Sequence, residues 1–175
     1  KLGARPEELN ITDPALIEGI HGQYAAAGSR IVNANTFGAS AHKLAGSAYT
    51  LEQVITAGIE NCKRACAPYG ALTALDVGPL GELLEPSGTL AFEDAVAEYA
   101  RIVKAGEAAG ADLIFFETYT DLYELKAALL AAKENTHLPI LASMSFEAGG
   151  RTFTGCTVES FAATARGLGA DAVGI

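Results

Sequence analysis

The sequence predicts an α/β fold in which parallel strands alternate with helices, and two observations lead to this prediction. One unit recurs along the 175 residues: an amphipathic helical stretch ends near a glycine, a small residue follows, and a short apolar run begins. The apolar runs do not alternate with polar residues, which is typical of strands buried on both faces of a parallel sheet. Five helix-then-strand units in succession therefore favour an α/β architecture.

The individual elements follow from local signals. Glycine just past a helix end adopts the left-handed conformation that closes the last turn, as expected in AAAGSRIVNANT (25–36), AAGADLIFFET (108–118) and GLGADAVGI (167–175). Strands are expected to start near 31, 71, 113, 139 and 171. Helices are expected over 13–27, 50–66, 90–108, 121–134 and 157–167. Their predicted N-caps are Asp13, Thr50, Asp121 and Thr157.

Two closures of the sheet are compatible with these units: an open doubly wound sheet or an eight-stranded (β/α) barrel. A full barrel needs about 250 residues, so this chain holds too few strands to close one. No G-x-G-x-x-G turn opens a helix, which argues against a dinucleotide-binding Rossmann fold. No linker or low-complexity segment divides the chain, so we expect residues 1–175 to form one incomplete domain.

Composition excludes several classes of partner. The net charge is −9, with 12 basic and 21 acidic residues, and an acidic surface repels nucleic acid. No apolar run is long enough to span a membrane. The opening KLGARPEELN lacks the apolar core of a signal peptide and is expected to lie inside a longer protein. Three cysteines, an odd number, favour reduced thiols in the cytoplasm.

Ligands of α/β folds bind at the carboxyl ends of the strands, so polar residues there are the candidate site residues. Glu117 closes the apolar run LIFF, where an unpaired carboxylate is costly and calls for a cation or several donors. A substrate ammonium would serve, as would a structural ion pair or a helix cap. Further polar strand-end residues are Asn33, Thr118, Tyr119, Ser143, Ser145 and Glu147.

Three other candidates have competing structural interpretations. Asn35 and Thr36 could donate to a substrate carboxylate, but the nearby turn at Gly38 favours bonds to backbone groups. Asp76 precedes Val77-Gly78-Pro79, where a turn-stabilising role is at least as well supported.

Other chemistry is weakly supported. Cys62 and Cys66 lie four residues apart on one helical face, but zinc needs three or four ligands, so apolar packing is favoured. The three histidines are scattered, and no catalytic triad, P-loop or H-E-x-x-H is present. The lysines considered for a Schiff base fall on expected helices, which disfavours an aldolase: Lys63, Lys104, Lys126 and Lys133.

Four segments occur in an order that resembles the homocysteine S-methyltransferase family. They are PEELNITDPALIEGIHGQYAAAGSRIVNANTFGAS, LDVGPLGELLEPSGTLAFEDA, ADLIFFETYTDLYELKAALLAAKEN and SFEAGGRTFTG. The chain most resembles the N-terminal barrel of bacterial cobalamin-dependent methionine synthases, over essentially its whole length. The resemblance implies a (β/α)8 TIM barrel, of which this chain would hold roughly strands two to six. It also implies a methyltransferase that binds homocysteine and uses zinc to lower the pKa of its thiol.

By resemblance, the methyl group would come from methylcobalamin on a corrinoid-binding domain. Glu117 matches the family's acidic residue that contacts the homocysteine amino group, and Asn35, Thr36 and Asp76 are the other substrate-binding candidates. The family's three zinc cysteines have no counterpart in Cys62, Cys66 or Cys156, so we assign no metal ligand and no catalytic residue here. Alone, the chain is expected to lack zinc and activity, and to self-associate through exposed sheet edges. A pterin-binding barrel, using Asn35 and Asp76, and a non-catalytic binding module remain the alternatives.

Overall fold

The structure is a computed structural model that describes residues 5–175. Five strands alternate with the longer helices, and two short elements precede the first long helix. In chain order the elements are η1 (Pro6–Glu8), α1 (Leu9–Thr12), α2 (Pro14–Ala26), β1 (Ile31–Asn33), α3 (Leu51–Cys66), η2 (Ala67–Tyr69), β2 (Leu72–Val77), α4 (Phe92–Ala108), β3 (Leu113–Tyr119), α5 (Leu122–Asn135), β4 (Ile140–Met144), α6 (Val158–Gly167) and β5 (Ala172–Gly174).

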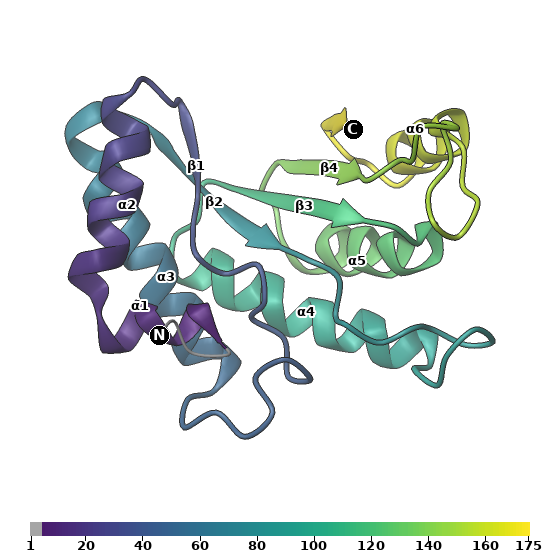
Figure 1. Cartoon of the computed structure of the whole chain (residues 1–175), viewed down its shortest axis with the longest axis horizontal. Helices are drawn as coiled ribbons and strands as arrows, with labels where there is room; N and C mark the ends of the chain where they lie inside the picture. The colour runs from purple at the N-terminus through teal and green to yellow at the C-terminus, as the bar shows by residue number, and fades with distance from the viewer. Residues whose placement is uncertain (1–4) are drawn as a thin grey trace.

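The five strands form one parallel sheet in the order β1-β2-β3-β4-β5. Crossovers between parallel strands are right-handed, so a strand order that never reverses places every connecting helix on the same face. Figure 1 shows this arrangement, with α3, α4 and α5 following one another beneath the strands. A doubly wound sheet would reverse its order and carry helices on both faces. The fold is therefore a segment of a (β/α) barrel, as predicted.

The local signals for the element ends are confirmed. Each strand starts within one residue of its expected position. Thr50 accepts a hydrogen bond from the Gln53 amide while the Gln53 side chain accepts from the Thr50 amide, which forms a capping box. Asp13, Asp121 and Thr157 also cap their helices through side-chain oxygens. The glycines after three of the helices have φ between 87° and 103°: Gly28, Gly110 and Gly169.

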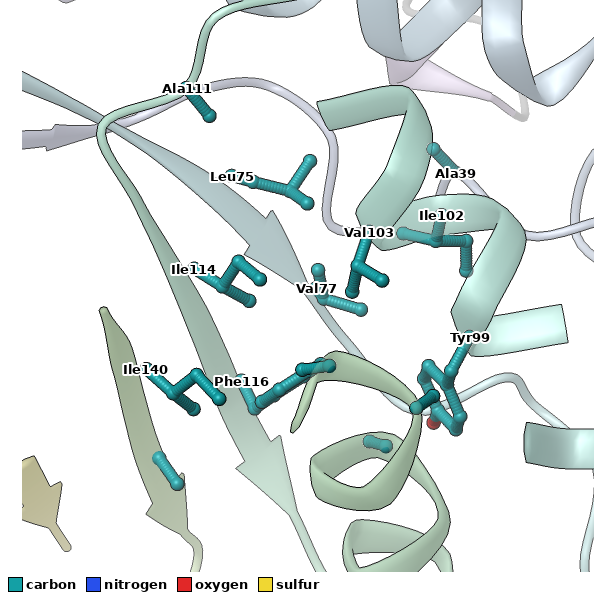
Figure 2. Packing of buried hydrophobic residues seen from close by; sticks show 14 of the residues in the cluster. Ala39, Leu75, Val77, Tyr99, Ile102, Val103, Ala111, Ile114, Phe116 and Ile140 are labelled. Atoms are coloured by element: carbon teal, nitrogen blue, oxygen red, sulfur yellow. The ribbon is translucent and has the colours of Figure 1, made fainter. Parts of the chain in front are cut away.

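The core lies between the sheet and its covering helices (Figure 2). Leu75 of β2 and Phe116 of β3 are fully buried and face α4, where the Tyr99 ring meets the Phe116 ring edge-on at 6.2 Å. Gly106 allows α4 to approach the sheet, because a Cβ there would lie 2.4 Å from a methyl carbon of Leu75. The strand face buried against these helices is the outer one, and the remaining side chains of the strands point to the opposite, concave face.

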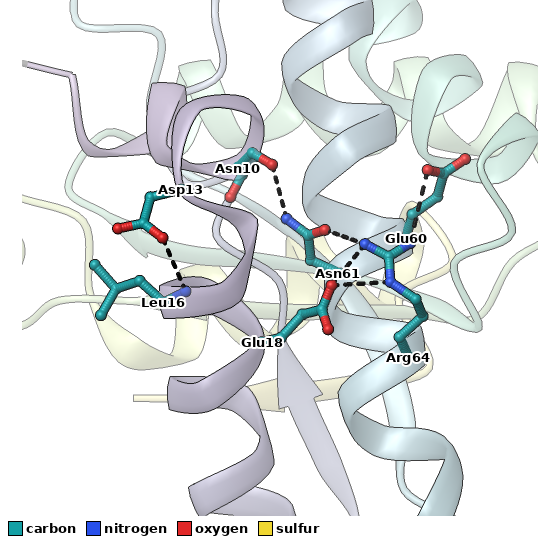
Figure 3. A network of polar contacts seen from close by, with 7 residues as sticks. All are labelled: Asn10, Asp13, Leu16, Glu18, Glu60, Asn61 and Arg64. Carbon is teal, nitrogen blue, oxygen red and sulfur yellow. Dashed lines mark hydrogen bonds and ion pairs between the residues drawn. The ribbon is translucent and has the colours of Figure 1, made fainter.

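A polar network joins α1, α2 and α3 on the outside of the fold (Figure 3). The Asn61 side chain donates to the Asn10 carbonyl oxygen at 2.9 Å, and Arg64 donates both to Asn61 and to Glu18, the latter at 2.8 Å. Sequence analysis did not predict α1 or η1, which place Asn10 in a buried position. Within residues 5–175, no helix has the length and apolar character needed to cross a bilayer.

Candidate functional site

Three polar side chains converge at the carboxyl ends of adjacent strands. Asn33 ends β1, Asp76 lies one residue before the end of β2, and Glu117 lies near the end of β3. Asn33 pairs with Ala74, and Asp76 with Phe115. Because side chains alternate along a strand, these registers place Asn33, Asp76 and Glu117 on one face of the sheet. All three line a cavity of about 460 Å³ that runs along β1 beside α2 and reaches the carboxyl ends of β2 and β3.

The position of Glu117 depends on an irregularity in β3. The register against β4 shifts between Phe116 and Tyr119. Both of these side chains face the helices, although two residues, Glu117 and Thr118, lie between them. Thr118 has φ of +66°, a left-handed conformation that is costly for a β-branched residue. Bulges of this kind redirect side chains near binding sites. Here the bulge keeps Glu117 on the concave face while Tyr119 returns to the core and donates to the Gly78 carbonyl oxygen at 3.2 Å.

Glu117 and Asp76 interact in a poorly solvated setting. Glu117 is partly buried, and its Oε2 accepts a hydrogen bond from Asn33 Nδ2 at 3.4 Å. Asp76 is only 6% exposed, and its Oδ1 has no hydrogen-bond partner among the residues that the structure describes. Burial, reinforced by the neighbouring Glu117 and by Glu7, raises the pKa of Asp76 to about 8. Burial also raises the pKa of Glu117, against the hydrogen bond that it accepts from the Asp76 carboxyl group.

The side chains of Asn35 and Thr36 bind backbone groups of distant segments, and not those of the turn at Gly38. The Thr36 hydroxyl donates to the Asp76 carbonyl oxygen at 2.8 Å and accepts from the Asp76 amide at 3.1 Å. Thr36 therefore extends the pairing of β2 past the end of β1 and holds the Asp76 backbone. Asn35 lines the cavity, but its side-chain amide donates to the Pro6 carbonyl oxygen and to the Asn10 side chain. The side-chain NH2 group of Asn35 is therefore engaged within the protein and is not free to donate to a ligand.

Two residues near the site were missed by sequence analysis. Glu7 is buried and its Oε1 accepts from the Gly38 amide at 2.8 Å, which fixes the turn after β1. His21 of α2 lines the cavity at 6% exposure, and its Nε2 has no partner within residues 5–175. Burial lowers the pKa of His21, so its ring is neutral near pH 7. No sequence signal placed either residue beside β1, because both contacts are made by segments that precede the strand.

The cysteines do not form a metal site. Cys62 and Cys66 are buried, with their sulfur atoms 3.8 Å apart, and Cys62 donates to the Val32 carbonyl oxygen. Burial raises the pKa of the Cys62 thiol to about 12, which opposes the thiolate that zinc requires. Over residues 5–175, no group of three or more histidine, cysteine or acidic side chains could hold a metal ion.

The fold and the site together define a class of protein: a (β/α) barrel segment with an acidic pocket at its strand ends. A family model described as homocysteine S-methyltransferase matches residues 3–175. The chain belongs to the homocysteine S-methyltransferase family. The resemblance drawn from the four sequence segments is confirmed.

Curated relatives and solved structures agree with this assignment. The methionine synthase of Mycobacterium tuberculosis is 28% identical over 97% of this chain, and that of Mycobacterium leprae is 29% identical over 97%. This chain spans about 15% of the length of each.

Among solved structures, the homocysteine methyltransferase MmuM from Escherichia coli matches with a TM-score of 0.89 in its oxidized form. The match has 20% identity and covers all of this chain and 66% of MmuM. The metallated form matches with a TM-score of 0.85 at 21% identity, over 96% of this chain and 65% of MmuM. The carboxyl transferase domain of Rhizobium etli pyruvate carboxylase matches with a TM-score of 0.61 at 18% identity, over 91% of this chain and 23% of that protein. At these identities the likeness is one of fold.

Proposed function

We propose that this chain supplies the amino-acid-recognising part of a methyltransferase that converts homocysteine to methionine. The observation that carries the proposal is the pairing of Glu117 and Asp76 in the cavity at the strand ends. Together with Asn33 they present side-chain oxygens and no positive charge, which suits the ammonium group of an amino acid. Membership in the homocysteine S-methyltransferase family supports homocysteine as that amino acid.

The residues have separate roles in this proposal. Glu117 and Asp76 bind the ammonium group, Thr36 positions Asp76 through its backbone, and Asn35 holds the turn that forms one wall of the cavity. The proposed domain is an incomplete homocysteine-binding barrel over residues 1–175. These contacts orient the substrate but do not themselves activate its thiol.

The family implies a zinc ion that lowers the thiol pKa of homocysteine, and the described residues do not fit it. Cys62 and Cys66 face the core with no third ligand, so we derive no step through zinc. The proposal places any zinc ligands outside this chain. It takes methylcobalamin on a corrinoid-binding domain as the methyl donor, supported by the LDVGP and GRTFTG segments. Three free thiols support a cytoplasmic location.

Calorimetric titration of the full-length protein tests the proposal. L-homocysteine should bind, whereas 4-mercaptobutyrate, which lacks only the α-amino group, should bind far more weakly. Glu117→Gln should raise the Kd for homocysteine roughly 10- to 100-fold, because a hydrogen bond to a charged group is lost. Glu134→Gln, an exposed change in the last turn of α5, is the matched control and should leave the Kd unchanged. Equal affinity for the two ligands would overturn the proposal.

A further inference from the structure

We propose that the Asp76 carboxyl group is protonated in the empty site and gives up its proton when the substrate ammonium group binds. The inference rests on the proposed function, since it concerns the same cavity. It adds that amino-acid binding is an exchange of cations, with one proton leaving the protein as one ammonium group enters.

The geometry of the empty site supports a shared proton. Asp76 and Glu117 lie on neighbouring strands and line the same cavity, and Asp76 is 94% buried with one oxygen that has no hydrogen-bond partner among the described residues. Two like charges so close together and so poorly solvated cannot both be retained without a cation. A proton on Asp76 removes one charge and provides the hydrogen bond that Glu117 accepts. Asn33 donates to the other side of Glu117, so Glu117 is the better site for the remaining charge.

Among residues 5–175, the groups around Asp76 offer no alternative cation. Glu117 of β3 and Glu7 of η1 are both acidic and disfavour a second negative charge. His21 of α2 lines the same cavity but is kept neutral by burial. Within the described part of the chain, no lysine or arginine forms an ion pair with Asp76 or Glu117. The proton is therefore the charge-balancing group until a ligand arrives.

An ammonium group is well matched to replace it. It has three N–H donors, and the site offers three oxygen-bearing side chains on one face: Asn33 Oδ1, Asp76 and Glu117. Once the ammonium group lies between the carboxylates, both can be ionised, because its charge offsets theirs. The bond that breaks is O–H on Asp76, and its proton passes to solvent. The ammonium group keeps its own protons.

This exchange predicts pH-dependent binding with a defined sign. Below pH 8 the empty site must lose a proton to bind, so affinity weakens as the pH falls. The Kd should rise about tenfold for each unit between pH 7 and pH 6. Glu124, a further buried acidic side chain near these loops, is already satisfied by two donors and is not expected to contribute to this slope.

The test is calorimetry on full-length protein treated with EDTA, using L-methionine and L-homocysteine as probes. Without metal the homocysteine thiol keeps its proton, and methionine has none to lose. Titrations at pH 6.5 in phosphate and in a buffer of different ionisation enthalpy measure the protons released. About one proton per ligand is expected for the wild type, and close to none for Asp76→Asn, which is the same shape as the protonated side chain. Glu134→Gln, the control in the last turn of α5, should behave like the wild type.

The outcomes separate this inference from the proposed function. Binding of either amino acid without proton release, or with the same release in Asp76→Asn, overturns the inference and leaves the proposed function standing. Failure of both amino acids to bind a folded protein, as judged by circular dichroism, overturns both. A change in proton release is not expected from a merely structural role of Asp76, because such a role would alter affinity at all pH values alike.

Discussion

Asp76 and Glu124 are both almost fully buried carboxyl groups, at 6% and 5% exposure, yet their surroundings differ sharply. Glu124 Oε1 accepts from the Leu80 amide at 2.7 Å and from the Tyr99 hydroxyl at 2.9 Å. Asp76 has a free oxygen beside a second acidic group. Burial alone therefore does not distinguish a structural carboxyl group from one that we propose to bind a ligand. The two carboxyl groups are distinguished by the number of hydrogen-bond donors that contact each of them.

The difference also separates two parts of the strand-end loops. Glu124 accepts a hydrogen bond from the Leu80 amide, and the Leu80 carbonyl oxygen accepts one from the Ser40 hydroxyl. These two bonds connect the loops after β1 and β2. Asp76 and Glu117 lie on the concave face with incomplete hydrogen bonding. A hydrogen-bond network in which every polar group has a partner is rigid, whereas a network with unpaired groups can still bind a ligand. The site thus combines a fixed frame with an incomplete polar surface.

The largest expected effect comes from removing the carboxyl group of Glu124, which accepts two buried hydrogen bonds. Glu124→Ala leaves the Leu80 amide and the Tyr99 hydroxyl buried without an acceptor and opens a cavity, so the free energy of unfolding should fall by more than about 3 kcal/mol. Glu124→Gln keeps one oxygen at the site and should lose roughly half as much. Urea denaturation measures both. If Glu124→Ala costs less than 1 kcal/mol, Glu124 does not hold this frame.

Asp76→Asn should change the free energy of unfolding in the opposite direction. Because the pKa of folded Asp76 is about 8, against an ordinary value of 3.8, its contribution to stability is fully present below about pH 4 and is lost as the pH rises toward 8. The amide does not titrate, so the variant should be more stable than the wild type at pH 8, by at least roughly 2 kcal/mol and at most the roughly 6 kcal/mol that about four pKa units represent. At pH 4 the two proteins should be nearly equal. Denaturation at both pH values checks the prediction, and a wild type whose stability is flat across this range would contradict it.

Thr36→Val tests the residue that holds Asp76 in place. The hydroxyl group serves both the amide and the carbonyl group of Asp76, and valine has the same shape without it. Loss of these two bonds should reduce the free energy of unfolding by about 1.5 kcal/mol and weaken homocysteine binding as Asp76 moves. Thr36→Ser keeps the hydroxyl and is the matched control. Equal stability of the two variants would show that these bonds contribute little.

Local signals allowed much of the fold to be predicted, and long-range contacts explain the rest. Helix caps and strand starts depend on a few neighbouring residues, so Thr50, Asp121 and their counterparts could be identified from type and spacing. Glu117 was found because an acidic residue ending an apolar strand is unusual. Thr36 was named as a direct ligand candidate, but its partner lies 40 residues away. No periodicity encodes such a contact.

The bulge at Thr118 is the feature with the weakest sequence signal and the smallest expected effect. A left-handed threonine is strained by roughly 1–2 kcal/mol, whereas glycine adopts this conformation freely but loses roughly 0.5–1 kcal/mol through the entropy of its unfolded chain. Thr118→Gly should therefore raise the free energy of unfolding by about 0.5 kcal/mol. Thr120→Gly, two residues on and without positive φ, should lower it, since there is no strain to relieve. Opposite signs in these two variants, measured by urea denaturation, would locate the strain at the residue next to Glu117, and equal signs would show that the bulge is relaxed.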